Sequence, residues 1–154
     1  MTNRNDDVLS PPNGLSTKSH TELLGETIQQ TNDLVQLLGG EWLDSASPPS
    51  AFDPTDRTGW RYLVPCDMNG TAEQYDIFIS QVRPLENPSA AINQVRSYWD
   101  SLGYRIGQIG PNDADDEQFT EISVALEHKA SLQFSASTTG MTIWISSECA
   151  AIEE

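Results

Sequence analysis

The C-terminal half of the chain, residues 118–149, most constrains what this sequence can fold into. It holds three runs in which apolar and polar residues alternate, separated by short turns at residues 128–130 and 138–140. Alternation with a period of two is typical of a strand that buries one face. The inward-facing residues would be Thr120, Ile122, Val124 and Leu126, then Leu132, Phe134 and Ala136, then Met141, Ile143 and Ile145. The pattern predicts an antiparallel meander whose last strand leads to Cys149.

The chain contains two cysteines, Cys66 and Cys149, and each follows the end of a predicted strand. We predict that they form a disulfide, which would tie the final strand to the first strand of the domain. A disulfide indicates an oxidising compartment. Two buried free thiols are the alternative.

Two helices are predicted from the residues that begin and end them. Ser19 and Glu22 have the spacing of a capping box, and Gly39-Gly40 ends the first helix. Asn87-Pro88 begins the second helix, which ends at Gly103. Each helix has an apolar stripe that we expect to pack on the sheet. The stripes comprise Leu24, Ile28, Thr31, Val35 and Leu38 in the first helix, and Ile92, Val95, Trp99 and Leu102 in the second.

Three more strands complete the predicted fold. Residues 60–64 and 75–79 alternate on either side of Asn69-Gly70, a dipeptide typical of a hairpin turn, and residues 105–109 form a further strand. The order is α-β-β-α-β-β-β-β. It predicts an α+β fold, a two-layer sandwich with a largely antiparallel sheet of about six strands and two helices on one face.

The composition of the two ends limits the folded domain to residues 19–149. Residues 1–18 are rich in Asn, Asp, Ser and Pro, which predicts a disordered tether, and residues 150–154 would form a short tail. At 154 residues, one domain of ordinary size is expected.

The net charge of −15 disfavours binding to phosphate backbones, so we expect no nucleic-acid partner. No stretch approaches the length and hydropathy of a membrane-spanning helix. We expect a monomer that binds a protein or a small ligand.

The sequence shows no motif with catalytic spacing, and we expect no enzyme and no cofactor. The acidic run at residues 112–117 resembles a calcium loop, but Gln118 and Val124 stand where such a loop needs Gly and Glu. A solvated acidic turn is the preferred interpretation. His20 and His128 have no partner at the spacing of a zinc site. We therefore predict no catalytic, cofactor-binding or metal-binding residues.

Aromatic residues are the candidate contact residues. Trp144 lies opposite the buried side of its strand, so we expect it either to lie on the helix-free face of the sheet or to contact a loop. The other two candidates are near the long loop at residues 44–58, which is rich in Pro, Ser and Asp. Trp42 lies just before this loop, and Phe52 lies within it.

The run from Val95 to Tyr104, with its Trp-x-x-x-Gly-Tyr pattern, and the closing Ser147-Glu148-Cys149 resemble a group of small exported lipoproteins of uncharacterised function from actinobacteria. The resemblance implies a cell-envelope protein in which Cys149 pairs with Cys66. It implies no catalytic residue.

Two functional hypotheses follow. The first is a non-enzymatic domain that is secreted or anchored to the cell envelope, with a signal segment and lipid anchor upstream of Met1. The alternative is an acidic cytoplasmic inhibitor or immunity protein, which would have free thiols and bind a basic partner.

Overall fold

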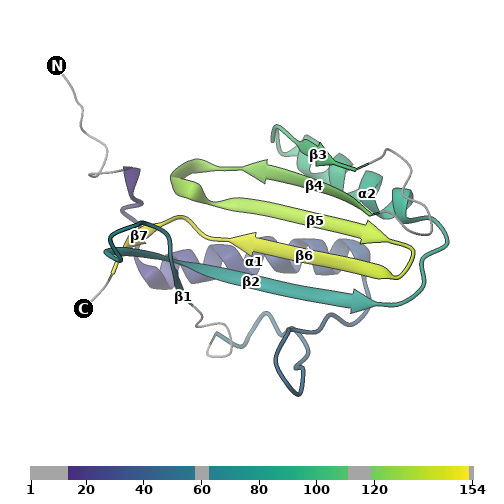
Figure 1. Cartoon of the computed structure of the whole chain (residues 1–154), viewed down its shortest axis with the longest axis horizontal. Helices are drawn as coiled ribbons and strands as arrows, with labels where there is room; N and C mark the ends of the chain where they lie inside the picture. Colours follow the sequence, from purple (N-terminus) through teal and green to yellow (C-terminus); the bar gives the residue numbers. More distant parts are fainter. Residues whose placement is uncertain (1–13, 58–62, 111–118, 153–154) are drawn as a thin grey trace.

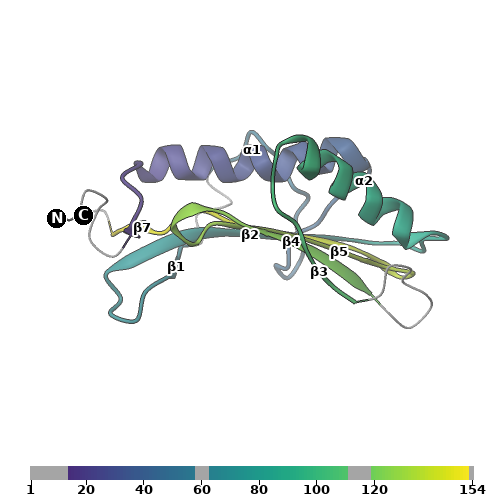
Figure 2. The same ribbon diagram turned by 90° about the horizontal axis from the view of Figure 1, so that it is seen from above.

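The structure, a computed structural model, describes residues 14–57, 63–110 and 119–152. Helices α1 (His20–Leu38) and α2 (Pro88–Ser101) cover one face of a seven-stranded sheet, and the other face carries no helix (Figures 1 and 2). The strands are β1 (Leu63–Pro65), β2 (Ala72–Val82), β3 (Gly107–Ile109), β4 (Thr120–Ala125), β5 (Ser131–Ser137), β6 (Gly140–Ser146) and β7 (Ala150–Ala151). Their order across the sheet is β1-β2-β6-β5-β4-β3, with β7 paired to β2. Because every pairing between these strands is antiparallel, the predicted α+β sandwich is confirmed.

Helix α1 has the predicted caps. The Ser19 hydroxyl accepts a hydrogen bond from the Glu22 amide at 3.1 Å, and Gly39 ends the helix with a φ of 75°. The buried side is turned slightly from the predicted stripe, since Leu23 and Leu34 are fully buried whereas Val35 is only half-buried. The buried threonines of α1 donate their hydroxyl protons to carbonyls one turn earlier, which explains how they fit in the core.

Helix α2 also begins as predicted. The Asn87 side chain accepts a hydrogen bond from the Ala90 amide, and Pro88 occupies the first turn. Three predicted stripe residues are buried, but Leu102 is 49% exposed. The helix ends at Ser101, so Leu102 leaves the buried stripe.

The meander of β4, β5 and β6 is confirmed. The inward residues of these strands are at most 3% exposed, and they form the core beneath the two helices. Leu126, predicted to continue the first run, is half-buried and lies beyond the end of β4. A three-residue 3₁₀ turn, η2 (Glu127–Lys129), connects β4 to β5.

The other strands differ in length from the prediction. Strand β2 has 11 residues, because it pairs with β1 and β7 near its start and with β6 along the rest. Strand β3 is limited to three exposed residues. The first predicted strand is seen only from Leu63 onward, and Trp60 and Tyr62 lie outside the described residues.

The folded region extends beyond residues 19–149 at both ends. Strand β7 lies within the expected tail and pairs with β2, and Ala150 is buried. Ser16, within the expected tether, forms a bridge with Ala150 and is also buried. The two ends of the described chain therefore meet at one end of the sheet (Figure 1).

Candidate functional site

The predicted disulfide between Cys66 and Cys149 is confirmed, and among the described residues no free cysteine occurs. A local irregularity brings the two residues together. Asp76 pairs with Ser146, and Glu73 pairs with Ala150, so three steps along β2 match four steps along the opposite segment. Ser147 fills the gap, since its hydroxyl accepts a hydrogen bond from the Tyr75 amide at 2.8 Å.

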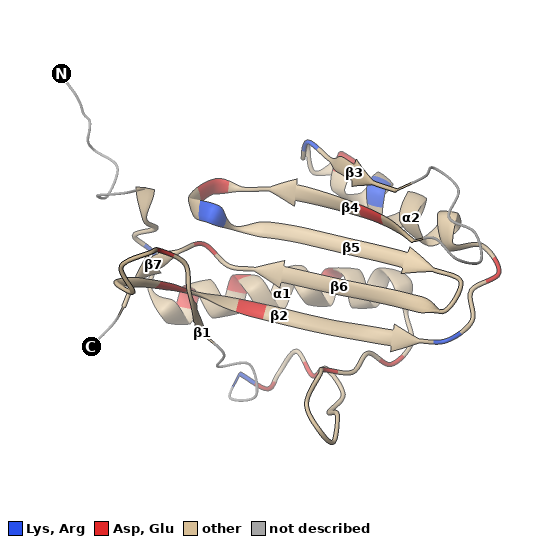
Figure 3. Cartoon of the chain, in the orientation of Figure 1, with Lys and Arg blue, Asp and Glu red and all other residues tan. Residues whose placement is uncertain are grey.

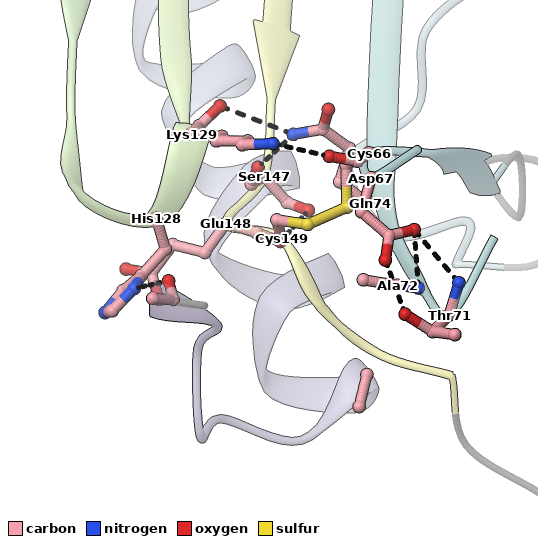
Figure 4. Close-up of a disulfide and its surroundings, with 12 residues drawn as sticks. Cys66, Asp67, Thr71, Ala72, Gln74, His128, Lys129, Ser147, Glu148 and Cys149 are labelled. Carbon is pink, nitrogen blue, oxygen red and sulfur yellow. Dashed lines mark hydrogen bonds between the residues drawn. A yellow bond between two sulfur atoms is a disulfide. The ribbon is translucent and has the colours of Figure 1, made fainter. Parts of the chain in front are cut away.

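Several segments converge on this disulfide (Figure 4). The Cys149 amide donates to the His128 carbonyl at 2.7 Å, and the Cys149 carbonyl accepts from the Ser16 amide at 2.8 Å. The Lys129 ammonium donates to the Cys66 carbonyl at 2.8 Å. The disulfide is thus part of a structural junction, and its sulfurs are not available as thiolate nucleophiles.

A small charge cluster lies beside this junction. The Lys18 ammonium contacts Glu26 at 3.0 Å and Glu148 at 3.2 Å. Burial alone would raise the pKa of the Glu148 carboxyl, but hydrogen bonds from Ser16 and Lys18 outweigh burial and lower it. The hydrogen bond to Glu26 raises the pKa of Lys18. This arrangement keeps the ion pair charged and holds residues 16–18 against the domain.

The structure contradicts the prediction for Trp42. Its side chain is 1% exposed and its indole N–H donates to the Gly39 carbonyl at 3.0 Å. Phe52 is half-buried against the core, and its amide donates to the Trp42 carbonyl. The described part of the long loop is therefore attached to the core through these two aromatic residues, and Trp42 is not a contact residue.

Of the two positions predicted for Trp144, the structure shows the helix-free face, where the side chain is 38% exposed. Its indole N–H donates to Asp76 Oδ1 at 2.9 Å, and the same carboxylate accepts the Ser146 hydroxyl proton. The ring of Phe78 packs edge-on against the indole, with 5.7 Å between centroids. These contacts fix the orientation of an exposed aromatic side chain.

The helix-free face is unusually poor in charge for a chain with a net charge of −15. Strands β5 and β6 contain no charged residue, and in Figure 3 the middle of this face is free of charged segments. Along β4 and the part of β2 that pairs with β6, the acidic residues that alternate with buried ones are Asp76 and Glu121. Serine, threonine and glutamine make up most of the rest of the outward surface.

Two adjoining hollows of about 350 and 240 Å³ lie on this face. They share Phe78, Ser135 and Thr142, so we describe them together as the trough. The floor of the trough runs across the strands and consists of residues paired side by side: Ser80, Thr142, Ser135 and Glu121. One wall contains Phe78, Trp144 and Gln133, and the other contains Val82 and Phe119.

Sequence reasoning identified Trp144 but missed the other apolar residues of the trough. Phe78 lies between the buried Ile77 and Ile79, so the period-two pattern already placed it on the outer face, whereas Val82 lies beyond the predicted strand at residues 75–79. The sequence did not show that strand pairing brings Phe119 of a distant segment to the same hollow.

The described residues contain no cluster of three or more His, Cys, Asp or Glu side chains that could hold a metal ion. Residues 111–118, which include the whole acidic run at 112–117, lie outside the described part. A membrane-spanning helix, long and apolar enough to cross a bilayer, is not found in the described segments.

Comparison of the chain with protein-family models, with curated proteins and with solved structures finds no match. The trough is therefore the feature of the described structure whose geometry and chemistry point to a function.

Proposed function

We propose that this protein is a non-enzymatic binding domain of an oxidising compartment, the cell envelope, and that it holds its ligand on the helix-free face of the sheet. The observation that carries the proposal is the trough, in which uncharged hydroxyl groups lie between exposed aromatic walls. Hollows of a few hundred Å³ with apolar walls and a small number of polar groups are the usual form of a ligand site.

The distribution of exposed apolar side chains supports a binding role for this face. Of the eight large apolar side chains that are exposed in the described ranges, five lie on it. These are Phe78, Val82, Ile109, Phe119 and Trp144. Contiguous exposed apolar surface on a soluble domain is typical of an interaction site.

The titratable groups for which the described structure shows a clear pKa shift lie away from the trough. They are Lys18 and Glu148 beside the disulfide, Asp67, whose pKa is lowered by the Thr71 hydroxyl, and Tyr98, whose pKa is raised by burial and by Asp33. Catalytic sites usually combine a pocket with perturbed acids or bases. The separation of the two features favours binding over catalysis.

The disulfide supports the assignment to an oxidising compartment. Gly14, the first described residue, accepts a hydrogen bond from His128 at the disulfide end of the sheet. An anchor attached upstream, as in the lipoproteins that the sequence resembles, would hold this end toward the membrane. The trough lies farther along the strands, so it would be held at a distance from the membrane.

The alternative of an acidic cytoplasmic inhibitor fits less well. It predicts free thiols, whereas both cysteines are paired. A surface that attracts a basic partner would also be strongly acidic, whereas the part of the trough that the structure describes contains one carboxylate, Glu121.

Site-specific photo-crosslinking in living host cells tests the proposal. A photo-reactive amino acid placed at Thr139, on the exposed rim of the trough, should give a crosslinked product, and the same residue at Asn93, exposed on α2, should not. Replacing both Phe78 and Trp144 with alanine should reduce the Thr139 product severalfold. Equal products from both positions, or a product unaffected by the double substitution, would overturn the proposal.

A further inference from the structure

We infer that the ligand of the trough is a neutral oligosaccharide. This inference rests on the proposed binding function and specifies its chemistry. Three features of the trough support it: the hydroxyl groups of the floor, the fixed aromatic walls and the scarcity of charge.

The floor presents hydroxyl groups that are not used within the protein. In the described structure, the side chains of Ser80, Ser135 and Thr142 make no hydrogen bond to another protein group. A hydroxyl both donates and accepts, and the Gln133 amide and the Glu121 carboxylate add further donors and acceptors at one end. A ligand that is itself rich in hydroxyls can satisfy all of these groups.

The walls present the apolar surface that the faces of sugar rings require. Trp144 is held by Asp76 and by Phe78, so little conformational entropy is lost when a ring packs against it. Phe119, 54% exposed, lies in the other wall. Phe78 and Val82, four residues apart on β2, are about 13 Å apart along the strand, which leaves room for a sugar chain between the walls.

The charge of the trough excludes the main competing ligands. The described residues that line it include no Lys or Arg and one carboxylate, so anionic polymers and phosphate groups are not attracted. A peptide added as an extra strand needs an open sheet edge, whereas the trough lies across the centre of the sheet, over β5 and β6. From β4 to β2 the floor extends about 14 Å, three strand spacings, which suits a short oligosaccharide.

Titration with defined oligosaccharides tests this inference. The probes are the neutral tetrasaccharides of glucose (β-1,4 and α-1,4), N-acetylglucosamine and mannose, with an anionic galacturonate tetramer and a cationic glucosamine tetramer for comparison. Binding is measured by calorimetry and by the change in the intrinsic fluorescence of the four tryptophans, among which Trp144 lies in the trough. At least one neutral probe should bind at least about tenfold more tightly than either charged probe.

Substitutions in the full chain then locate the binding. The single substitution Trp144→Ala should weaken binding of the neutral probe about tenfold, which corresponds to about 1.4 kcal/mol. The double variant with Ser135→Ala and Thr142→Val should weaken it by a similar factor. Ser131→Ala is the matched control, because Ser131 points outward from the same strand but does not line the trough, and it should leave affinity unchanged. Unfolding temperatures equal to that of the wild type would exclude a general loss of structure in these variants. If Trp144→Ala unfolds, Trp144→Phe replaces it in the test, and this variant should retain part of the affinity.

The outcomes separate this inference from the proposed function. Failure of all neutral probes, or tighter binding of a charged probe, would overturn the oligosaccharide assignment. Crosslinking from Thr139 to a protein that carries no glycan would overturn it also, but would leave the binding function in place.

Discussion

Asp76 shows how one residue can prepare a surface for binding without facing the ligand. Its carboxylate accepts hydrogen bonds from both Trp144 and Ser146, and it lies outside the set of residues that line the trough. Its role is therefore to position the indole of Trp144. Exposed aromatic side chains without such a partner change rotamer more freely.

We predict that Asp76→Ala releases the Trp144 side chain. The indole N–H resonance of Trp144 should shift and broaden in the ¹⁵N–¹H spectrum, and the free energy of unfolding should fall by about 1 kcal/mol. Asp76→Asn, which keeps an acceptor oxygen, should restore a sharp resonance. An unchanged Trp144 resonance in the alanine variant would show that Asp76 does not hold the ring.

At the disulfide end of the sheet, the lowered pKa of Glu148 leads us to predict that stability depends on pH. The pKa of Glu148 is lower in the folded protein than the ordinary value of 4.5. Its contribution to the free energy of unfolding is therefore complete above pH 4.5 and is lost as the pH falls through the pKa of the folded state. Glu148→Gln should reduce the free energy of unfolding on the order of 0.5 to 1 kcal/mol at neutral pH. The difference from the wild type should vanish in acid, as measured by urea unfolding at several pH values. Glu86→Gln, an exposed control, should show no such difference.

At the scale of elements, local signals determined what could be predicted from the sequence. The caps at Ser19 and Asn87 act within four residues, and the alternation of β4, β5 and β6 follows from the geometry of a strand. These signals correctly predicted where the helices begin and which face of β4, β5 and β6 is buried, but they predicted the buried stripes of the helices only in part. They did not predict the burial of Trp42, because its core position depends on how α1 and β2 pack.

Pairings between distant segments were beyond the reach of local patterns. The extra residue before β7 is accommodated by the Ser147 side chain, and nothing in the sequence around Ser147 marks it for this role. The trough likewise depends on strand register, which places Phe119 near residues that lie 37 or more positions earlier in the chain. Sequence reasoning therefore found one wall residue, Trp144, but not the site.

The first turn of α1 provides a test at this scale. Ser19→Ala removes the hydroxyl that accepts the Glu22 amide proton, so the free energy of unfolding should fall by about 1 kcal/mol. Thr21→Ala, an exposed change in the same turn, should be neutral or slightly stabilising. Equal effects of the two substitutions in urea unfolding would contradict the assignment of Ser19 as the cap.

For the whole molecule, the disulfide joins the opening hairpin to the last strands of the sheet. The two cysteines are 83 residues apart in sequence, for which the chain-entropy model gives about 4.5 kcal/mol of stabilisation. We expect Cys66→Ser with Cys149→Ser to lower the free energy of unfolding by about 3 to 5 kcal/mol. Reduction of the wild type should produce a similar loss, and the double variant should be insensitive to reductant. A double variant as stable as the wild type would remove the structural role of the bond.

The same architecture separates stability from binding. The disulfide, the N-terminal segment and the ion pair of Lys18 and Glu148 lie at one end of the sheet, whereas the trough crosses the face beyond them. Variants at Phe78, Trp144 or Ser135 should therefore change ligand binding without large changes in stability. This independence makes the binding surface accessible to mutagenesis.

The most direct test of the account is a map of amide chemical-shift changes when a neutral tetrasaccharide that binds is added to the ¹⁵N-labelled protein. The account predicts the largest changes at Ser80, Ser135, Thr142 and Trp144, with little change in α1, α2 or the loop at residues 44–57. Changes centred on the helices or on that loop, with the trough residues unaffected, would contradict it.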